Sequence, residues 1–334
     1  MKNTSTATLF LCLLFCMLTT SCEKTIKFRG EESEPKLVVN AMVDEDTDTI
    51  FVRVSRSLFF TDLREVSRGL PNSEVEVWVN GQSIGKAPYL RIYGGDYRQT
   101  PYGLSYHTGE SLFGIPYKVK PADKVRITVY NSEYGTATAE TIIPSRLEIL
   151  SIEAGSLTQP DDNDVIYDSY FPIKVTFKDN PIESNFYKLS VRQRGYTKYY
   201  YEDKVYLNEE MRYIYCKDTH LGITGDFFPN LFFTDKNING QEYTLEFKML
   251  TNGREVISDE TFTDTVFLTI ESLSEDYLLY YASKNSEDML DDIFDIEIFS
   301  EPRQIYSNVE GGIGLVCGRS KESHIAFTIK RSSM

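Results

Sequence analysis

Apolar residues are distributed along this chain in two ways: one continuous stretch at the start and many short alternating runs afterwards. The continuous stretch reaches from Ala7 to Cys22 and follows a single positive residue, Lys2. Its apolar core ends at Leu18 and is too short to cross a bilayer, which takes roughly 20 residues. A short apolar core followed by small residues is typical of a secretory signal. We therefore expect residues 1–21 to form a cleaved signal peptide.

From residue 36 onward, apolar and polar residues alternate with a period of two, which predicts β-strands. The clearest run is residues 74–79 (EVEVWV), whose three valines share one face. Asn80 and Gly81 follow it directly and suit a tight hairpin, because both tolerate positive φ. Further strands are predicted at residues 36–43, 49–55, 124–130 and 136–143. Short strands with turn signals and no helix predict an immunoglobulin-like β-sandwich over residues 36–144.

The second half, residues 145–334, shows the same alternation and is predicted to form a second β-sandwich domain. Its predicted strands are residues 171–177, 185–192, 241–249 and 264–270. Residues 274–290 predict one helix, with Ser274 as its N-terminal cap and two acidic residues in the first turn, where the helix dipole favours negative charge. The predicted fold class is therefore all-β, with two sandwiches and one helix near the C-terminus.

The residue that ends the opening apolar stretch is a cysteine. Thr19, Thr20 and Ser21 precede Cys22, and small residues directly before a cysteine resemble the lipobox of bacterial lipoproteins. That resemblance implies that acyl chains such as palmitate are attached to Cys22 and that the chain is cut before it. Two or three acyl chains make membrane anchoring stable, whereas one does not. The alternative is an ordinary cleaved signal with an incidental cysteine. Residues 22–35 are polar and without periodicity, which predicts a tether.

The formal net charge is −15 and the sequence pI is about 4.8. Such a balance argues against nucleic acid, whose binding depends on Lys and Arg neutralising phosphates. It also argues against a surface that lies on anionic lipid.

Two cysteines, Cys216 and Cys317, remain beyond the opening segment. In an oxidising compartment they can form one disulfide. The alternative is a pair of buried thiols, and the sequence leaves both open.

Tyrosine is abundant, with 23 residues, and it gathers in two places. Exposed tyrosine supplies rigid, amphipathic contact area that suits sugar faces, peptides or a partner protein. The alternative is cross-strand aromatic pairing within sheets. The candidate ligand or partner contacts are Tyr93, Tyr97, Tyr102 and Tyr106, near Tyr89, and Tyr199, Tyr200 and Tyr201, near Tyr196.

No catalytic, metal or cofactor residue is predicted. The histidines, at positions 107, 220 and 324, have no paired spacing that would suit a metal. Asp44, Asp46 and Asp48 alternate like the start of a calcium loop, but Thr49 and Ser55 occupy the positions where such a loop needs glycine and glutamate. Asp161, Asp162 and Asp164 offer carboxylates that a calcium loop could use, and we favour the alternative, a solvated acidic turn. Binding is therefore favoured over catalysis.

A glycine-rich segment, residues 307–315 (SNVEGGIGL), leads into a predicted closing strand. Gly311, Gly312 and Gly314 predict positive φ or a very close approach to another part of the chain. A phosphate-binding loop is excluded, because the spacing is not G-x-G-x-x-G and no helix follows. We interpret the segment, with Asn308, as a structural turn that seats the last strands.

Four features together resemble the family of Bacteroidota lipoproteins called domain of unknown function 4249. They are Cys22, the early LVVNAMV strand, the helix around residues 277–281, and the SNVEGGIGL segment. The family pattern usually continues into an aromatic residue where this chain has Val316 and Cys317. The resemblance implies a lipoprotein of the outer membrane, often encoded beside TonB-dependent receptors, with no established activity.

We therefore expect a lipid-anchored outer-membrane protein that acts as a non-catalytic accessory binding subunit of a TonB-dependent receptor. Which face of the membrane it occupies, and its ligand, are left open. The alternative is a structural or assembly protein of the envelope that binds other proteins only.

Overall fold

Strands make up most of the chain that the computed structural model describes, and the predicted all-β class is confirmed. The described residues are 34–57, 68–94, 97–99, 105–107, 109–159, 169–198, 205–251, 262–285 and 305–331. Within them the helical element is α2 (Glu275–Asn285). Pro35–Met334 form one compact unit.

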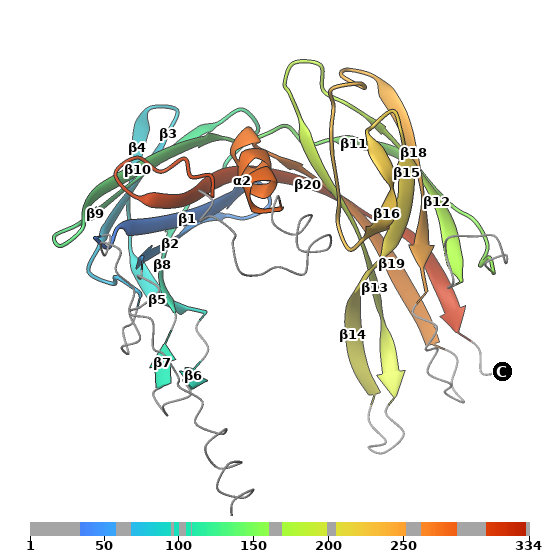
Figure 1. The fold of residues 1–334 in the computed structure, drawn as a ribbon, viewed down its shortest axis with the longest axis horizontal. Coiled ribbons are helices and arrows are strands. Elements are labelled where there is room, and N and C mark those ends of the chain that lie inside the picture. Colours follow the sequence, from blue (N-terminus) through green and yellow to red (C-terminus); the bar gives the residue numbers. More distant parts are fainter. Residues whose placement is uncertain are drawn as a thin grey trace, which may run out of the picture. The chain divides into compact units, whose positions relative to one another are not determined.

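The largest sheet has nine strands and runs through the whole of this unit (Figure 1). Eight of them follow the order β14-β13-β19-β20-β1-β2-β8-β5, and β17 pairs with β13. Their bounds are β14 (Val205–Arg212), β13 (Phe186–Lys198), β19 (Phe262–Leu273), β20 (Ile313–Arg331), β1 (Leu37–Asp44), β2 (Thr49–Arg56), β8 (Glu110–Pro116), β5 (Tyr89–Tyr93) and β17 (Leu231–Thr234).

The first hydrophobic core lies between β1, β2 and β8 on one side and a four-stranded sheet on the other. That sheet has the order β10-β9-β3-β4, with β3 (Glu74–Val79), β4 (Gln82–Ala87), β9 (Lys124–Asn131) and β10 (Gly135–Ile142). Alternate residues of β1, β3 and β9 are buried, as the period of two predicts, and the three valines of β3 are at most 4% exposed. The predicted hairpin is confirmed, because Asn80 and Gly81 have φ of 51° and 80°.

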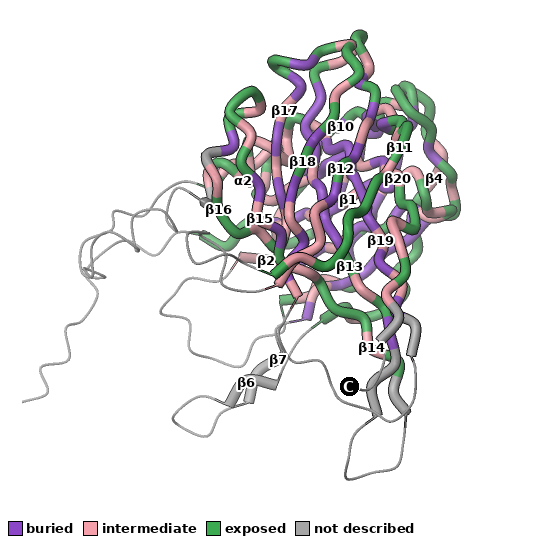
Figure 2. Tube along the Cα trace, turned by 90° about the vertical axis from the view of Figure 1, so that its right-hand side faces the viewer, coloured by how far each residue is buried: buried purple, intermediate pink, exposed green. Residues whose placement is uncertain are grey.

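The second core lies between the β13, β17, β19 and β20 side of the nine-stranded sheet and a five-stranded sheet. In Figure 2 buried and more exposed residues alternate along these strands. The five-stranded sheet has the order β11-β12-β18-β15-β16, with β11 (Glu148–Ala154), β12 (Tyr170–Lys178), β18 (Glu242–Leu250), β15 (Ile214–Asp218) and β16 (Ile223–Phe228). A separate pair, β6 (Tyr97–Gln99) and β7 (Ser105–His107), is antiparallel.

Strand β20 belongs to both cores. Its first residues, Ile313 to Arg319, pair in parallel with β1, and from Arg319 to Arg331 it pairs antiparallel with β19. Val316 is part of the first core, whereas Phe327 packs against the second. The two cores therefore share one continuous strand, in addition to the connection between β10 and β11.

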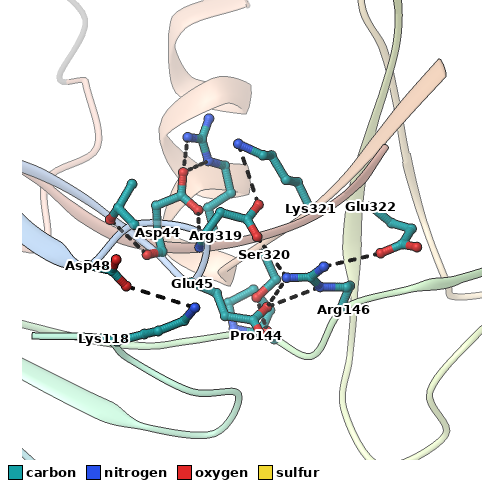
Figure 3. A network of polar contacts seen from close by, with 12 residues as sticks. Asp44, Glu45, Asp48, Lys118, Pro144, Arg146, Arg319, Ser320, Lys321 and Glu322 are labelled. Atoms are coloured by element: carbon teal, nitrogen blue, oxygen red, sulfur yellow. Dashed lines mark hydrogen bonds and ion pairs between the residues drawn. The ribbon is translucent and has the colours of Figure 1, made fainter. Parts of the chain in front are cut away.

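Ion pairs surround the point where β20 changes partners (Figure 3). The Arg319 guanidinium binds Asp44 of β1 and, at 3.0 Å, Glu271 of β19, and both carboxylate side chains are less than 10% exposed. Arg146, between β10 and β11, contacts Glu45, Asp46 and Glu322 at 2.8–3.4 Å. These side chains join the turn after β1 to the second half of the nine-stranded sheet.

Helix α2 begins at Glu275, as predicted, but Ser274 does not cap it in the expected way. The Ser274 hydroxyl accepts a hydrogen bond from the Gly318 amide at 3.1 Å, and the Ser274 amide donates to the Gly318 carbonyl at 3.0 Å. The Ser274 hydroxyl, which was predicted to cap the helix, therefore bonds to the backbone of β20 instead. Residues 286–290 of the predicted helix lie outside the described residues. Among the described helical residues, none forms a helix long and apolar enough to span a bilayer.

Cys216 and Cys317 are both free and buried. Burial raises the pKa of each thiol to about 12, with a smaller contribution from Asp218 at Cys216 and from Asp276 at Cys317. The reactive form of cysteine is the thiolate, which is scarce at neutral pH when the pKa is this high.

We expect both thiols to be unreactive in the folded protein. A chain that begins at Glu23 should show no rapid reaction with a disulfide reagent at pH 8, and both cysteines should react once the chain is unfolded without reductant. The readout is thiol release followed by absorbance. A disulfide between the two would leave no thiol after unfolding and would contradict this arrangement.

Candidate ligand-binding site

The glycine-rich segment passes between two sheets and forms one margin of the site. Gly314 has φ of 131°, and a Cβ there would lie within 3.0 Å of the Val39 carbonyl oxygen. A Cβ on Gly311, where φ is 73°, would meet the Thr136 carbonyl oxygen of β10 in the same way. The predicted positive φ and close approach are therefore both present.

Asn308 fixes this segment through its side-chain amide. Its Nδ2 donates to the carbonyls of Val316 at 2.7 Å and Glu140 at 3.2 Å, and its Oδ1 accepts from the Val316 amide at 3.0 Å. The Asn308 side-chain amide thus bonds to Val316 through both its donor and its acceptor, as the peptide group of a neighbouring strand would. Ser307 adds a second tie, because its hydroxyl accepts from the Gly314 amide at 3.0 Å.

A cleft of about 580 Å³ opens on the outer face of β1 and β20. Its floor consists of the residues of these strands that point away from the first core, a consequence of their alternation. Much of it is apolar, formed by Val38, Met42, Ile313, Leu315 and Cys317. A volume of this size falls within the range of small-molecule sites, roughly 300–1,000 Å³.

Three tyrosines contributed by α2 and the segment before β20 line the cleft: Tyr277, Tyr280 and Tyr306. Tyr306 is held in place, because its hydroxyl donates to Asp276 at 2.8 Å and its amide donates to the Ser283 hydroxyl at 2.9 Å. Burial, together with the hydrogen bond to Asp276, raises the pKa of Tyr306 to about 12. The phenol therefore stays protonated at neutral pH.

Two polar residues of the cleft lining, Asn40 and Arg53, contact Glu110 beside the cleft, where β1, β2 and β8 lie side by side. The Arg53 guanidinium lies 3.4 Å from the Glu110 carboxylate, and Asn40 Nδ2 donates to Glu110 at 3.4 Å. Ser55 donates to the same carboxylate at 3.5 Å. Asn40 is oriented by the Leu315 amide, which donates to its Oδ1 at 3.1 Å.

One of the sequence-predicted contacts adjoins this site. Tyr93 of β5 is 45% exposed, and the Arg53 guanidinium carbon lies 5.7 Å from its ring centroid, a cation–π distance. Tyr89 instead packs edge-on against Phe113, with ring centroids 5.7 Å apart, which is the cross-strand pairing named as the alternative. Tyr97, Tyr106 and Tyr196 lie in β6, β7 and β13, but their side chains are outside the described residues, as are Tyr102, Tyr199, Tyr200 and Tyr201 altogether.

The sequence missed most of the cleft. Tyr277, Tyr280 and Tyr306 were not among the predicted contacts. Asn40 had a usable signal, since it is a polar residue in the middle of the otherwise apolar run LVVNAMV. Arg53 had a weaker one, since β2 also contains Thr49, Ser55 and Arg56. Neither signal showed that the two outer faces adjoin the same helix.

The cleft offers side chains suited to recognition. It combines aromatic rings, a guanidinium, an amide and apolar floor residues. The Cys317 thiol also lines it, but with a pKa raised by burial to about 12 it is a poor nucleophile. Among the described residues, no group of three or more His, Cys, Asp or Glu could hold a metal ion. The aspartates that alternate near the start pair with Arg319, Arg146 and Lys118.

The chain belongs to the family described as domain of unknown function (DUF4249), whose model matches residues 23–325. Comparison with curated proteins gave no match. Among solved structures, the chain is similar to carbohydrate-binding modules from the β-sandwich superfamily, at 10% identity and a TM-score of 0.17. That match covers 72% of this chain and 97% of the other.

Proposed function

We propose that this protein is a non-catalytic binding protein, held at the outer membrane by acyl chains on Cys22. The observation that carries the proposal is the cleft of about 580 Å³, which joins three tyrosines to the polar side chains of Asn40 and Arg53. Glu110 contacts both of these polar side chains. Binding sites combine an apolar lining with a few placed polar groups, and this cleft has that composition.

The proposed anchor rests on the sequence before the folded unit. The apolar stretch ends at Cys22, and the family match begins one residue later, at residue 23. A match that starts there supports a mature protein that begins at the cysteine.

Replacing Cys22 with serine is expected to abolish lipidation. Metabolic labelling with an alkyne palmitate analogue should mark the wild-type protein and leave Cys22→Ser unlabelled, because the hydroxyl is not the acylated thiol. Cys216→Ser is the matched control and should label fully, since that thiol is buried in the second core. Equal labelling of Cys22→Ser and wild type would contradict the proposed lipid anchor at Cys22.

The proposed partner is a TonB-dependent receptor, with the protein presenting its ligand to that receptor. Purification of the tagged lipoprotein from detergent-solubilised native membranes tests this. A co-purified TonB-dependent receptor supports the accessory role. Co-purified envelope proteins without a receptor favour the alternative, a structural or assembly component that binds other proteins only.

A further inference from the structure

We propose that the ligand of the cleft is a neutral saccharide, an inference that rests on the proposed binding function and specifies its ligand class. A sugar ring has apolar C–H faces and a rim of hydroxyl groups that both donate and accept hydrogen bonds. The cleft presents half-buried tyrosine rings to the apolar faces, and the polar side chains of Asn40 and Arg53 to the hydroxyl groups.

The charge of the polar group favours an uncharged ligand. Arg53 and Glu110 oppose each other at 3.4 Å, so together they carry no net charge. An anion on the remaining donors of Arg53 would lie close to the Glu110 carboxylate, which repels it. A cation would have to replace Arg53 at that carboxylate. An uncharged hydroxyl can instead accept from Arg53 while the ion pair stays together.

The hydrogen-bond geometry leaves room for such hydroxyls. Glu110 accepts from Asn40 and Ser55 at 3.4 and 3.5 Å, which is long for bonds to a carboxylate. The Arg53 side chain is 42% exposed and has donors left beyond its contact with Glu110. Arg53, which lines the cleft, therefore keeps donors that are open to a ligand hydroxyl.

The tyrosines supply the apolar half of the recognition. Tyr277, Tyr280 and Tyr306 belong to neighbouring turns and a tied segment, so their rings are held before a ligand arrives. Rigid aromatic contact costs little conformational entropy. A fully apolar ligand fits less well, because it would cover Asn40 and Arg53 without offering hydrogen bonds.

The experiment uses the mature lipoprotein in detergent micelles on an array of neutral, sialylated and sulfated oligosaccharides, together with a hexapeptide array. We expect binding to neutral oligosaccharides that falls at least tenfold in Arg53→Gln and in Tyr280→Ala. Both variants keep strand and helix propensity, and Arg53 is exposed enough for the change to be tolerated. Tyr130→Ala is the control, since Tyr130 lies on β9 and is 48% exposed, and it should bind like wild type.

The other outcomes overturn the proposal in distinguishable ways. Binding confined to acidic oligosaccharides, or to peptides, and lost in Arg53→Gln would overturn the neutral saccharide and leave the cleft as a binding site. Neutral sugar binding that Arg53→Gln and Tyr280→Ala both retain would place the sugar elsewhere. If no ligand on either array binds in a way that Arg53→Gln and Tyr280→Ala weaken, both the ligand class and the proposed site are wrong.

Discussion

Gly314→Ala is expected to cost the protein much of its stability. The backbone at Gly314 has φ of 131°, and the new Cβ would lie within 3.0 Å of the Val39 carbonyl oxygen in the parallel pairing of β1 with β20. A strained backbone conformation costs about 1–3 kcal/mol, and forcing an extra methyl into packed structure costs about as much again. Domains are stable by only about 5–15 kcal/mol, so the loss is a large fraction of the total.

Urea unfolding monitored by circular dichroism measures this change. Gly135→Ala is the matched control, because Gly135 also has positive φ, 80°, but a Cβ there meets nothing within 4 Å. It carries the conformational strain without the clash, so it should lose roughly 1 kcal/mol. Equal losses in the two variants would show that the close approach of β1 and β20 does not matter, against the structure.

The second large effect is expected from Arg319→Met. The change leaves the carboxylates of Asp44 and Glu271 without the cation between them, and their side chains are only 6% and 9% exposed. Breaking a buried ion pair by removing one partner costs about 3–5 kcal/mol, because a buried charge is left uncompensated. Lys188 still pairs with Glu271 at 2.6 Å, so the larger part of the loss falls on Asp44.

Thermal and urea unfolding again supply the measurement. Arg192→Met is the control on the same sheet, since Arg192 is 45% exposed and pairs with Glu209, which Arg194 also binds. Exposed pairs contribute about 0–1 kcal/mol, and the control should lose no more than that. A loss in Arg319→Met as small as that of the control would mean that Asp44 and Glu271 are hydrated rather than buried.

Local patterns predicted the strands well. Residues 74–79 were predicted and observed with the same bounds, and the Asn80-Gly81 turn has the expected positive φ at both residues. Alternation and turn chemistry act over a few residues, so each can be read without knowing what lies opposite. The Ser274 cap shows the limit, because its hydroxyl is used by Gly318, a residue far along the chain.

The candidate site was predicted only in part. Tyr93 was predicted as a contact because it lies in a cluster of tyrosines, and it does lie beside Arg53. Tyr277 and Tyr280 were not predicted as contacts, since spacing on a helix shows which residues share a face but not what that face adjoins. Asn40 and Glu110 meet across β1, β2 and β8 through pairings between distant segments, and nothing local encodes that meeting.

The sequence by itself determined the all-β class, the positions of nine of the twenty strands in the described residues, and the need for glycine where the last strand begins. These features depend on short-range periodicity and backbone sterics. Only the tertiary structure decided that β20 pairs in parallel with β1, joins both cores and brings α2 over the outer face of the sheet to form the cleft. The physical reason is that strands choose distant partners by burying whole faces together, and that choice is made by the complete chain.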